Sequence, residues 1–351
     1  MNGFAWTCPH CEGLLRAGDA LWSCRDCGAG FRALRGIPDL RVLDDPYLPN
    51  DEDWRIALRL DTAFDRCDFR ELLDRYYELA PDVSPAQRTR QIQHILTAPG
   101  RVGRWRNSLG IVDGTLLDLG CGSGSFLSAI GQDTSMLAGV DIAMRWLLVA
   151  RKRLDEEGLE AIPLACACAE RLPIGPDRLD GIIAGDVFEH VADQLSTLNE
   201  AHRVLRPGGR MFLASPNRFS LAPEPHVGVW GVGYLPRRWM SPYVQLLRKG
   251  DFRALRTLGV AEWERMLKSS SFVTGRIEVP PLPAEELAHF GTIKRRIARC
   301  YNRFVVTRLG QRLALAIGPL FHVTVAKAPA QSPLVTSPAT RPRSRPSAAR
   351  A

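Results

Sequence analysis

The sequence predicts an α/β protein with a doubly wound sheet that follows a small cysteine-rich module, and three observations lead to this organisation. Short apolar runs alternate with helical patterns between residues 114 and 327, a glycine-rich loop follows the first run, and paired cysteines precede the whole region. Continuous apolar runs of about five residues are typical of buried parallel strands, and strand–helix repetition places helices on both faces of the sheet. Ligands of such sheets bind at the C-terminal ends of the strands.

Five apolar runs are expected to form parallel strands, and two later β-like runs are expected to close a seven-stranded sheet. The parallel strands are predicted at Thr115–Leu119, Met136–Val140, Ala161–Ala165, Leu179–Ala184 and Arg210–Ala214. The closing strands are predicted at Thr274–Val279 and Leu320–Ala326, with a helical insertion between them at about residues 284–318.

Composition divides the 351 residues into four regions. Residues 1–43 are rich in cysteine and glycine, and residues 44–113 have helical patterns that predict a cap or linker. Residues 114–327 form the predicted α/β domain. Residues 328–351 consist mainly of Pro, Ser, Ala and Arg, and this composition predicts a disordered tail.

The net charge of +8 is concentrated in the C-terminal quarter. Residues 331–351 carry +4 and residues 284–330 carry +6, so residues 1–283 sum to −2. A domain that binds nucleic acid normally has a cluster of Lys and Arg on its own surface, so the charge pattern argues against a nucleic-acid partner. The sequence lacks both an apolar stretch of membrane-spanning length and a secretory signal at its start, so we expect a cytoplasmic protein.

Four of the nine cysteines have the spacing of a metal site. Cys8 and Cys11 form one C-x2-C pair, and Cys24 and Cys27 form a second pair after twelve intervening residues. Four thiolates in two such pairs complete a tetrahedral site that suits Zn²⁺, and a closed site of this kind is structural. His10 lies inside the first pair and is not expected to be a ligand.

The glycine-rich loop has the pattern D-x-G-x-G-x-G, formed by Asp118, Gly120, Gly122 and Gly124. Glycines allow backbone N–H groups to approach a ligand closely, and the pattern matches neither the dinucleotide fingerprint nor a phosphate-binding Walker loop. A second acid, Asp141, follows the second predicted strand, where a carboxylate can accept both hydroxyls of a ribose. Zwitterionic S-adenosylmethionine (SAM) needs an amine acceptor, a carboxylate site and a ribose clamp, and this arrangement offers all three.

Residues 114–215 resemble the class I SAM-dependent methyltransferases, especially the small-molecule methylases related to enzymes of quinones and secondary metabolites. The stretches that carry the resemblance are LLDLGCGSG, GVDIA, AERLPIGPDRLDGIIAGDVFEHV and EAHRVLRPGGRMFLASPN, in this order. Residues 1–43 are similar to the small zinc-ribbon proteins that activate methyltransferases, here joined to the same chain. The resemblance implies a Rossmann-like methyltransferase sheet that binds SAM, with a zinc ribbon and a helical cap.

The resemblance also implies roles for individual residues. Asp118 and Gly120 would contact the methionine part of SAM, Asp141 and Ile142 the ribose, Ala169 and Glu170 the adenine edge, while Asp186 and Val187 would line the pocket. This chain departs from the family at Cys168, where many members have an Asp that accepts the adenine amino group. A thiol accepts weakly, so backbone groups or Glu170 are expected to hold the adenine instead.

Two histidines are candidate bases for an acceptor hydroxyl, because an imidazole titrates near neutral pH. His190 follows the fourth predicted strand at the expected mouth of the pocket, where it either acts as a base or orients the loop. His226 lies in a stretch rich in Gly, Pro and aromatic residues that extends to Trp239. Such a stretch is either a shaped loop over an acceptor pocket or a surface loop pinned by its aromatic side chains.

The predicted function is SAM-dependent methylation of a small or carrier-linked molecule at oxygen. The alternatives are an RNA methyltransferase, and a non-catalytic regulator that keeps the fold and recruits a partner through the ribbon. A basic amphipathic pattern over residues 293–317 either covers the sheet or contacts an anionic membrane surface. The oligomeric state cannot be read from the sequence.

Overall fold

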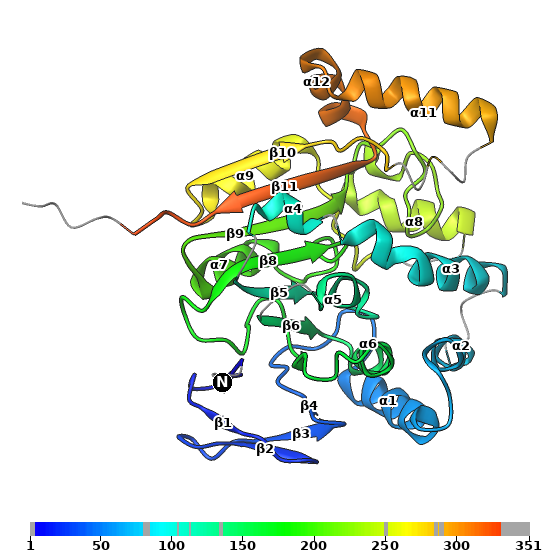
Figure 1. Cartoon of the computed structure of the whole chain (residues 1–351). Helices are drawn as coiled ribbons and strands as arrows, with labels where there is room; N and C mark the ends of the chain where they lie inside the picture. The colour runs from blue at the N-terminus through cyan, green and yellow to red at the C-terminus, as the bar shows by residue number, and fades with distance from the viewer. Residues whose placement is uncertain are drawn as a thin grey trace, which may run out of the picture.

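The computed structural model describes residues 4–79, 85–103, 105–111, 114–132, 136–248, 252–283, 287 and 291–330. Two sheets organise this part of the chain, one of seven strands and one of four. Figure 1 shows the large sheet at the centre, the small sheet at the N-terminal end of the molecule, and a pair of helices that projects at the opposite end.

The large sheet has the strand order β10-β11-β9-β8-β5-β6-β7. Its strands are β5 (Thr115–Leu119), β6 (Met136–Asp141), β7 (Leu164–Cys166), β8 (Leu179–Gly185), β9 (Leu205–Pro216), β10 (Thr274–Glu278) and β11 (Leu320–Ala326). Neighbouring strands are parallel from β7 to β9, whereas β11 runs antiparallel to both β9 and β10. The predicted α/β class and the seven strands are confirmed, and the sheet is mixed.

The third predicted strand lies further along the chain than the apolar run Ala161–Ala165 suggested, because β7 begins at Leu164. Pro163 has no backbone N–H to donate to a neighbouring strand. The Arg151 guanidinium also donates to the carbonyl of Ile162 at 3.0 Å. Residues 161–163 therefore form a turn before the strand begins at Leu164.

The helices of the described residues fall into an N-terminal group, a group wound around the sheet and a C-terminal group. They are α1 (Asn50–Phe64), α2 (Phe69–Glu78), α3 (Pro85–Val102), α4 (Trp105–Leu109), α5 (Ser125–Ile130), α6 (Met144–Glu156), α7 (Gln194–Val204), the 3-10 turn η1 (Val232–Tyr234), α8 (Arg237–Arg248), α9 (Val260–Ser269), α11 (Thr292–Val305) and α12 (Arg308–Ile317).

Alternate residues of β5 face two separate cores. Leu117 packs in one core with Leu198 of α7, and Leu116 packs in the other with Phe126 of α5 and Leu147 of α6. This alternation follows from the two-residue period of a strand, and it means that helices cover both faces of the sheet. The N-terminal helices stack on the second face, α1 and α2 beside α6 and α3 beside α5 (Figure 1).

The four-stranded sheet is formed by antiparallel pairs in the order β1-β2-β3-β4, from β1 (Leu15–Arg16) through β2 (Leu21–Cys24) and β3 (Gly30–Leu34) to β4 (Ile37–Pro38). The chain leaving β4 attaches to the large sheet, because Asp39 forms a parallel bridge with Cys166 of β7. The Leu40 N–H donates to the Cys166 carbonyl at 2.7 Å. The N-terminal module therefore covers the β7 edge of the sheet, which is an edge that would otherwise be open to pairing.

Helices α11 and α12 form a hairpin between β10 and β11 and lie within the predicted insertion. In Figure 1 this hairpin stands clear of the large sheet. No helix of the described residues is long and apolar enough to span a bilayer. The predicted disordered tail lies outside the described residues from position 331 onward.

Candidate functional site

The glycine-rich loop turns sharply between β5 and α5. Gly120, Gly122 and Gly124 have φ values of +72°, +50° and +73°, a region that other residues rarely adopt. A Cβ on Gly120 would also lie 2.3 Å from Cγ2 of Val187, so the close approach of the segment that follows β8 requires glycine there. The loop thus presents bare backbone to the C-terminal edge of the sheet.

Asp141 at the end of β6 braces this loop. Its Oδ2 accepts the Gly122 N–H at 2.8 Å, and its Oδ1 accepts the Ala143 N–H at 2.9 Å. Each carboxylate oxygen can accept a further hydrogen bond, so the side chain retains acceptor capacity toward a ligand.

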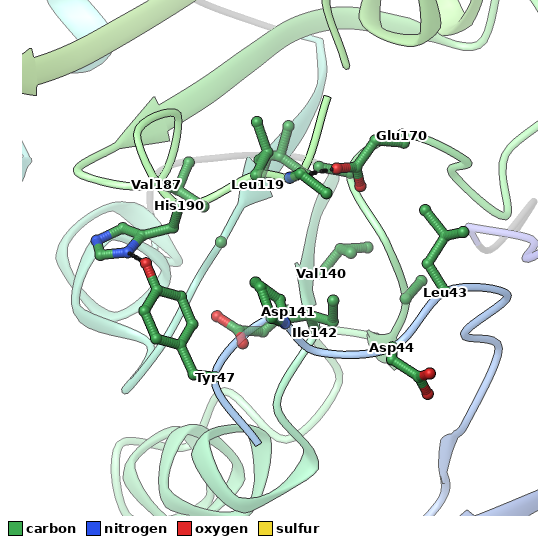
Figure 2. Close-up of a pocket in the computed structure, with 16 residues that line it drawn as sticks. Leu43, Asp44, Tyr47, Leu119, Val140, Asp141, Ile142, Glu170, Val187 and His190 are labelled. Atoms are coloured by element: carbon green, nitrogen blue, oxygen red, sulfur yellow. Dashed lines mark hydrogen bonds between the residues drawn. The ribbon is translucent and has the colours of Figure 1, made fainter. Parts of the chain in front are cut away.

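The main pocket opens at the C-terminal ends of β5, β6 and β8 (Figure 2). Its cavity volume is about 70 Å³, and further space at its rim is open to solvent. The predicted residues that line it are Gly120, Asp141, Ile142, Ala169, Glu170, Val187 and His190. The predicted residues Asp118, Gly122, Gly124, Asp186 and His226 lie outside this lining.

Two buried carboxyl groups lie at this edge of the sheet, Asp141 in the lining of the pocket and Asp118 in β5 outside the lining. Burial, with the negative charge of Asp141 added, raises the pKa of Asp118 to about 8. Burial also raises the pKa of Asp141 to about 6, although the N–H groups of Ala143 and Gly122 oppose the rise. No described cation forms an ion pair with Asp118. A cationic ligand group beside it would therefore stabilise its ionised form against the cost of burial.

The contacts of Cys168 and Glu170, which were predicted near an adenine, differ from what the sequence suggested. The Cys168 thiol is fully buried and faces the backbone of Leu43, whose N–H lies 3.3 Å from the sulfur. Oε1 of Glu170 accepts the N–H groups of Ala192 and Asp193 at 2.8 and 3.1 Å. The Cys168 thiol therefore holds the segment at Leu43 in place. Only the second carboxylate oxygen of Glu170 remains to bind a ligand.

The segment between the N-terminal module and α1 forms a wall of the pocket that sequence reasoning missed. Leu43, Asp44, Pro46 and Tyr47 all line the cavity, and Figure 2 shows this segment opposite the loop that carries His190. The Tyr47 hydroxyl and Nδ1 of His190 share a hydrogen bond of 2.5 Å. No motif marks this wall, because its position follows from the attachment at β7.

The buried carboxylate of Asp53 holds this wall to the sheet. Its two oxygens pair with Arg41 at 2.9 Å and with Arg145 of α6 at 2.7 Å, and Asp53 is fully buried. Arg41 also pairs with Asp39 and donates to the carbonyl of Ile142 at 3.0 Å. The N-terminal module, α1 and the strand end at Asp141 are thus joined through one charge network.

A second group of titratable side chains lies beside the pocket at the end of β8. Glu189, His190 and His226 have ligand atoms within 4.8 Å of one another. Oε2 of Glu189 accepts the Ser215 hydroxyl at 2.9 Å, while Oε1 lies 3.6 Å from Nε2 of His226. The sequence pointed to both histidines, and the structure brings them together across 36 residues with ring centroids 4.8 Å apart.

The environment separates the proton affinities of these groups. Burial, with the charge of His226 added, lowers the pKa of His190 to about 4, so His190 is neutral at pH 7. Burial, with the charge of Asp186 added, raises the pKa of Glu189 to about 8. Burial alone would lower the pKa of His226, but the hydrogen bond and charge of Glu224 outweigh it and raise this pKa.

The loop that carries His226 is pinned by its own polar contacts. Nδ1 of His226 lies 2.7 Å from Oε1 of Glu224. The Trp230 indole donates to the Leu221 carbonyl at 3.0 Å, and the Tyr234 hydroxyl donates to the Phe219 carbonyl at 2.6 Å. These contacts hold the loop in place, with Nε2 of His226 facing Glu189.

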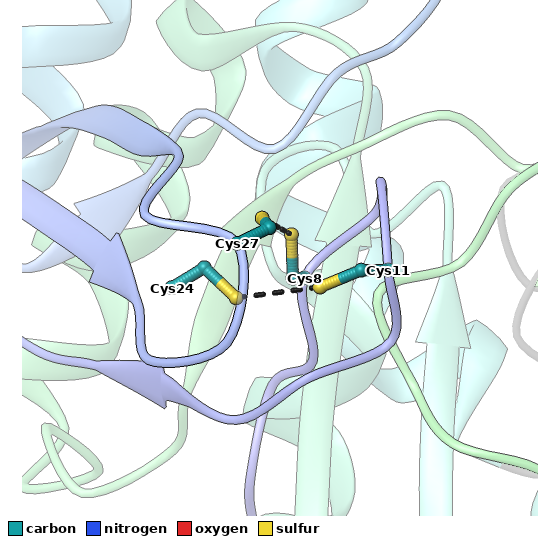
Figure 3. Close-up of side chains that lie close together, drawn as sticks. All are labelled: Cys8, Cys11, Cys24 and Cys27. Atoms are coloured by element: carbon teal, nitrogen blue, oxygen red, sulfur yellow. Dashed lines mark hydrogen bonds between the residues drawn. The ribbon is translucent and has the colours of Figure 1, made fainter.

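The four N-terminal cysteines meet at one point (Figure 3). The sulfurs of Cys8 and Cys27 lie 3.7 Å apart, and those of Cys11 and Cys24 lie 3.4 Å apart. Four ligands at ~2.3 Å from a tetrahedral Zn²⁺ are separated by about 3.8 Å, so the observed spacing fits this ion.

The family and the relatives that match this chain are all described as methyltransferases. The methyltransferase domain family matches residues 117–213. The chain is 31% identical over 172 residues to the ubiquinone biosynthesis O-methyltransferase of Pseudomonas paraeruginosa, covering 48% of this chain and 69% of that protein. It is 26% identical over 152 residues to the ubiquinone biosynthesis O-methyltransferase of Serratia proteamaculans, covering 43% of this chain and 59% of that protein.

Among solved structures, the YcgJ protein from Bacillus subtilis superimposes with a TM-score of 0.41 and 19% identity, covering 66% of this chain and 98% of that chain. A score this low adds nothing to the strand order described above.

Proposed function

Because this chain belongs to the class I SAM-dependent methyltransferases, we propose that it transfers the methyl group of SAM to a hydroxyl oxygen of a small or carrier-linked acceptor. The observation that carries the proposal is the placement of a histidine pair with two glutamates beside the pocket formed by the glycine loop and Asp141. The named activity of the relatives as O-methyltransferases supports the choice of oxygen.

Asp141 in the pocket lining and Asp118 in the adjoining strand β5 fit SAM. Asp118 is buried without an ion-pair partner among the described residues, which suits the ammonium group of the methionine part. Asp141 stands at the end of β6 with acceptor capacity left on both oxygens, which suits the ribose hydroxyls. SAM, when bound, supplies an electrophilic methyl group on a sulfonium, and alignment with exclusion of water accounts for much of the acceleration.

The chain supplies the base from the histidine pair. Glu224 accepts the proton of Nδ1 of His226, which leaves Nε2 with a lone pair. We assign to Nε2 the acceptor's hydroxyl proton, because the pKa of His226 is raised above its ordinary value whereas the pKa of His190 is lowered to about 4, which makes His226 the stronger base. His190, which lines the donor pocket and is held by Tyr47, positions the reacting groups.

The N-terminal module is assigned a structural zinc. Cys8, Cys11, Cys24 and Cys27 would hold the ion, and four protein ligands leave no open position for catalysis. The ion would supply folding free energy to a small module whose own core is limited.

The first test of the proposal is SAM binding by calorimetry with Asp141→Asn. The substitution keeps the shape of the side chain but removes its charge and one acceptor oxygen, so we expect the Kd for SAM to rise by about a hundredfold. Glu160→Gln, an exposed acid after α6, serves as the matched control and should not change the Kd. Binding of SAM by Asp141→Asn within about threefold of the natural protein would contradict the ribose assignment.

The second test addresses the base through His226→Asn. We expect the rate of transfer from methyl-labelled SAM to a panel of phenols and catechols to fall by about 10² to 10³, with SAM affinity unchanged. His202→Asn, in α7, is the control and should keep the natural rate. A natural rate in His226→Asn would remove this residue from the mechanism.

The pH profile separates a base from a merely structural histidine. A base must be unprotonated, so the rate should rise with pH through the raised pKa of His226. Glu224→Gln removes the negative charge that stabilises the imidazolium, so the pKa should fall and the acid limb should move to lower pH. If the acid limb of the rate profile has the same pH midpoint in Glu224→Gln as in the natural protein, the assigned effect of Glu224 on the pKa of His226 is contradicted.

A further inference from the structure

One face of α11 exposes large apolar side chains to solvent. Ile293, Ile297 and Phe304 are 77%, 64% and 43% exposed. At ~100° per residue these three positions fall within about 40° of one another around the helix. They therefore form a single stripe along α11.

The stripe has a counterpart on the second helix of the hairpin and at the turn that joins the two. Val306 and Leu309 are 67% and 63% exposed, and Leu313 and Ile317 are 49% and 41% exposed. Scattered single apolar residues on a surface are ordinary, but a group of this kind on one hairpin marks an interaction site. We name the seven apolar residues of α11, the turn and α12 the hairpin face.

The hairpin is fixed in this orientation by its other side. Ala298 and Val305 are buried, and the side chain of Asn302 exchanges two hydrogen bonds of 2.8 Å with the backbone of Leu282. Gln311 exchanges two more with the backbone of Val279, at 3.1 and 2.7 Å. The apolar side chains of the hairpin face therefore cannot turn inward without breaking these contacts.

The charged side chains of the hairpin itself are all basic. Residues 292–317 contain seven Lys and Arg and no Asp or Glu. On α11, Arg296, Arg299 and Arg303 are exposed; by helical spacing Arg296 and Arg303 lie beside the stripe, and Arg299 lies further around the same side of the helix. Within the part of the chain that the structure describes, no carboxylate lies within ion-pair distance of these three guanidinium groups.

We propose that the hairpin face docks this protein onto the surface of an anionic lipid bilayer. An apolar stripe bordered by cations buries its side chains at the boundary of headgroups and acyl chains, while the cations meet the anionic headgroups. A nucleic acid would pair with the cations but would leave the apolar stripe in water. The charge complementarity and the apolar area together select a lipid surface.

The hairpin face is linked to the loop that carries His226. The Leu221 N–H donates to the Ile317 carbonyl at 3.1 Å, and the Asn217 N–H donates to the Pro319 carbonyl at 3.1 Å. The base of the hairpin and the loop beside the donor pocket are therefore one connected structure. Docking would bring the loop that carries His226 near the bilayer. Taken with the proposed function, this position suits an acceptor whose hydroxyl group is attached to a lipid.

The test is cosedimentation of the full chain with vesicles. We expect binding to vesicles of phosphatidylglycerol mixed equally with phosphatidylcholine, and binding at least about tenfold weaker to phosphatidylcholine alone. The double variant Ile293→Ser with Ile297→Ser, and separately Arg296→Gln with Arg299→Gln, should each lower binding to the anionic vesicles by about tenfold or more. Leu58→Ser with Val273→Ser, also exposed, is the matched control and should bind as the natural protein does.

Calorimetric binding of SAM by each variant shows that it is folded and keeps this test independent of the proposed activity. Equal binding to neutral and anionic vesicles, or full binding by Ile293→Ser with Ile297→Ser, would overturn the proposal. A dimer by light scattering that the same apolar variant dissociates, with no sedimentation on vesicles, would overturn it in favour of an interface between two copies.

Discussion

Removing the proposed zinc of the N-terminal module with a chelator is expected to unfold this module and to weaken SAM binding by roughly tenfold. Structural zinc contributes about 10–16 kcal/mol to the folding of small four-ligand modules, far more than the few buried apolar residues of this module can supply. The chain that leaves β4 lines the donor pocket at Leu43 and Tyr47. Losing the module should therefore loosen one wall of the pocket.

The measurement is titration of released zinc with a metal-sensitive dye, followed by calorimetry with SAM before and after chelation. Linkage is reciprocal, so saturating SAM should also slow zinc release. Cys300→Ser, an exposed cysteine of α11, controls for thiol effects and should leave the zinc content at one per chain. Purified protein without zinc would refute the metal site, and an unchanged Kd after zinc removal would show that module and pocket are uncoupled.

Local patterns were sufficient to predict the parts of this fold that depend on neighbours in sequence. The apolar run Thr115–Leu119 predicted β5 at its observed bounds, because a strand buried on both faces leaves a continuous apolar signature. The C-x2-C pairs predicted the cluster of Cys8, Cys11, Cys24 and Cys27 for a similar reason, since each pair is fixed by its own turn. The error at β7 came from reading Ile162 as a strand residue when Pro163 ends the turn.

The missed parts of the site depend on contacts between distant segments. Tyr47 meets His190 across 143 residues, and Arg41 meets Ile142 across 101 residues. Nothing in the composition around Tyr47 distinguishes it from a surface tyrosine. Glu189 was likewise passed over beside His190, although its burial between two imidazoles is what gives the group its unusual proton affinities.

Asp53→Asn will lower the free energy of unfolding by about 3 kcal/mol, because Asp53 is buried between two guanidinium groups. Asparagine has nearly the same shape, so packing is kept while the negative charge is lost. Arg41 would retain Asp39 and Arg145 would retain Asp45, which limits the cost to the lower part of the range for broken buried pairs. Backbone N–H groups at the start of α6 would also lose a charged acceptor.

Asp51→Asn, two residues earlier on α1, is the matched control. The Asp51 side chain is 90% exposed and its nearest cation, Arg32, lies at 3.6 Å, so the substitution should change stability by less than about 0.5 kcal/mol. Urea unfolding measures both variants, and calorimetry with SAM on each shows whether the network also supports the pocket. Equal stability of the two variants would mean that the charge of Asp53 is dispensable. In that case the donor pocket would be held by the backbone bridge at Cys166, and the link from the zinc module to SAM would run through β7.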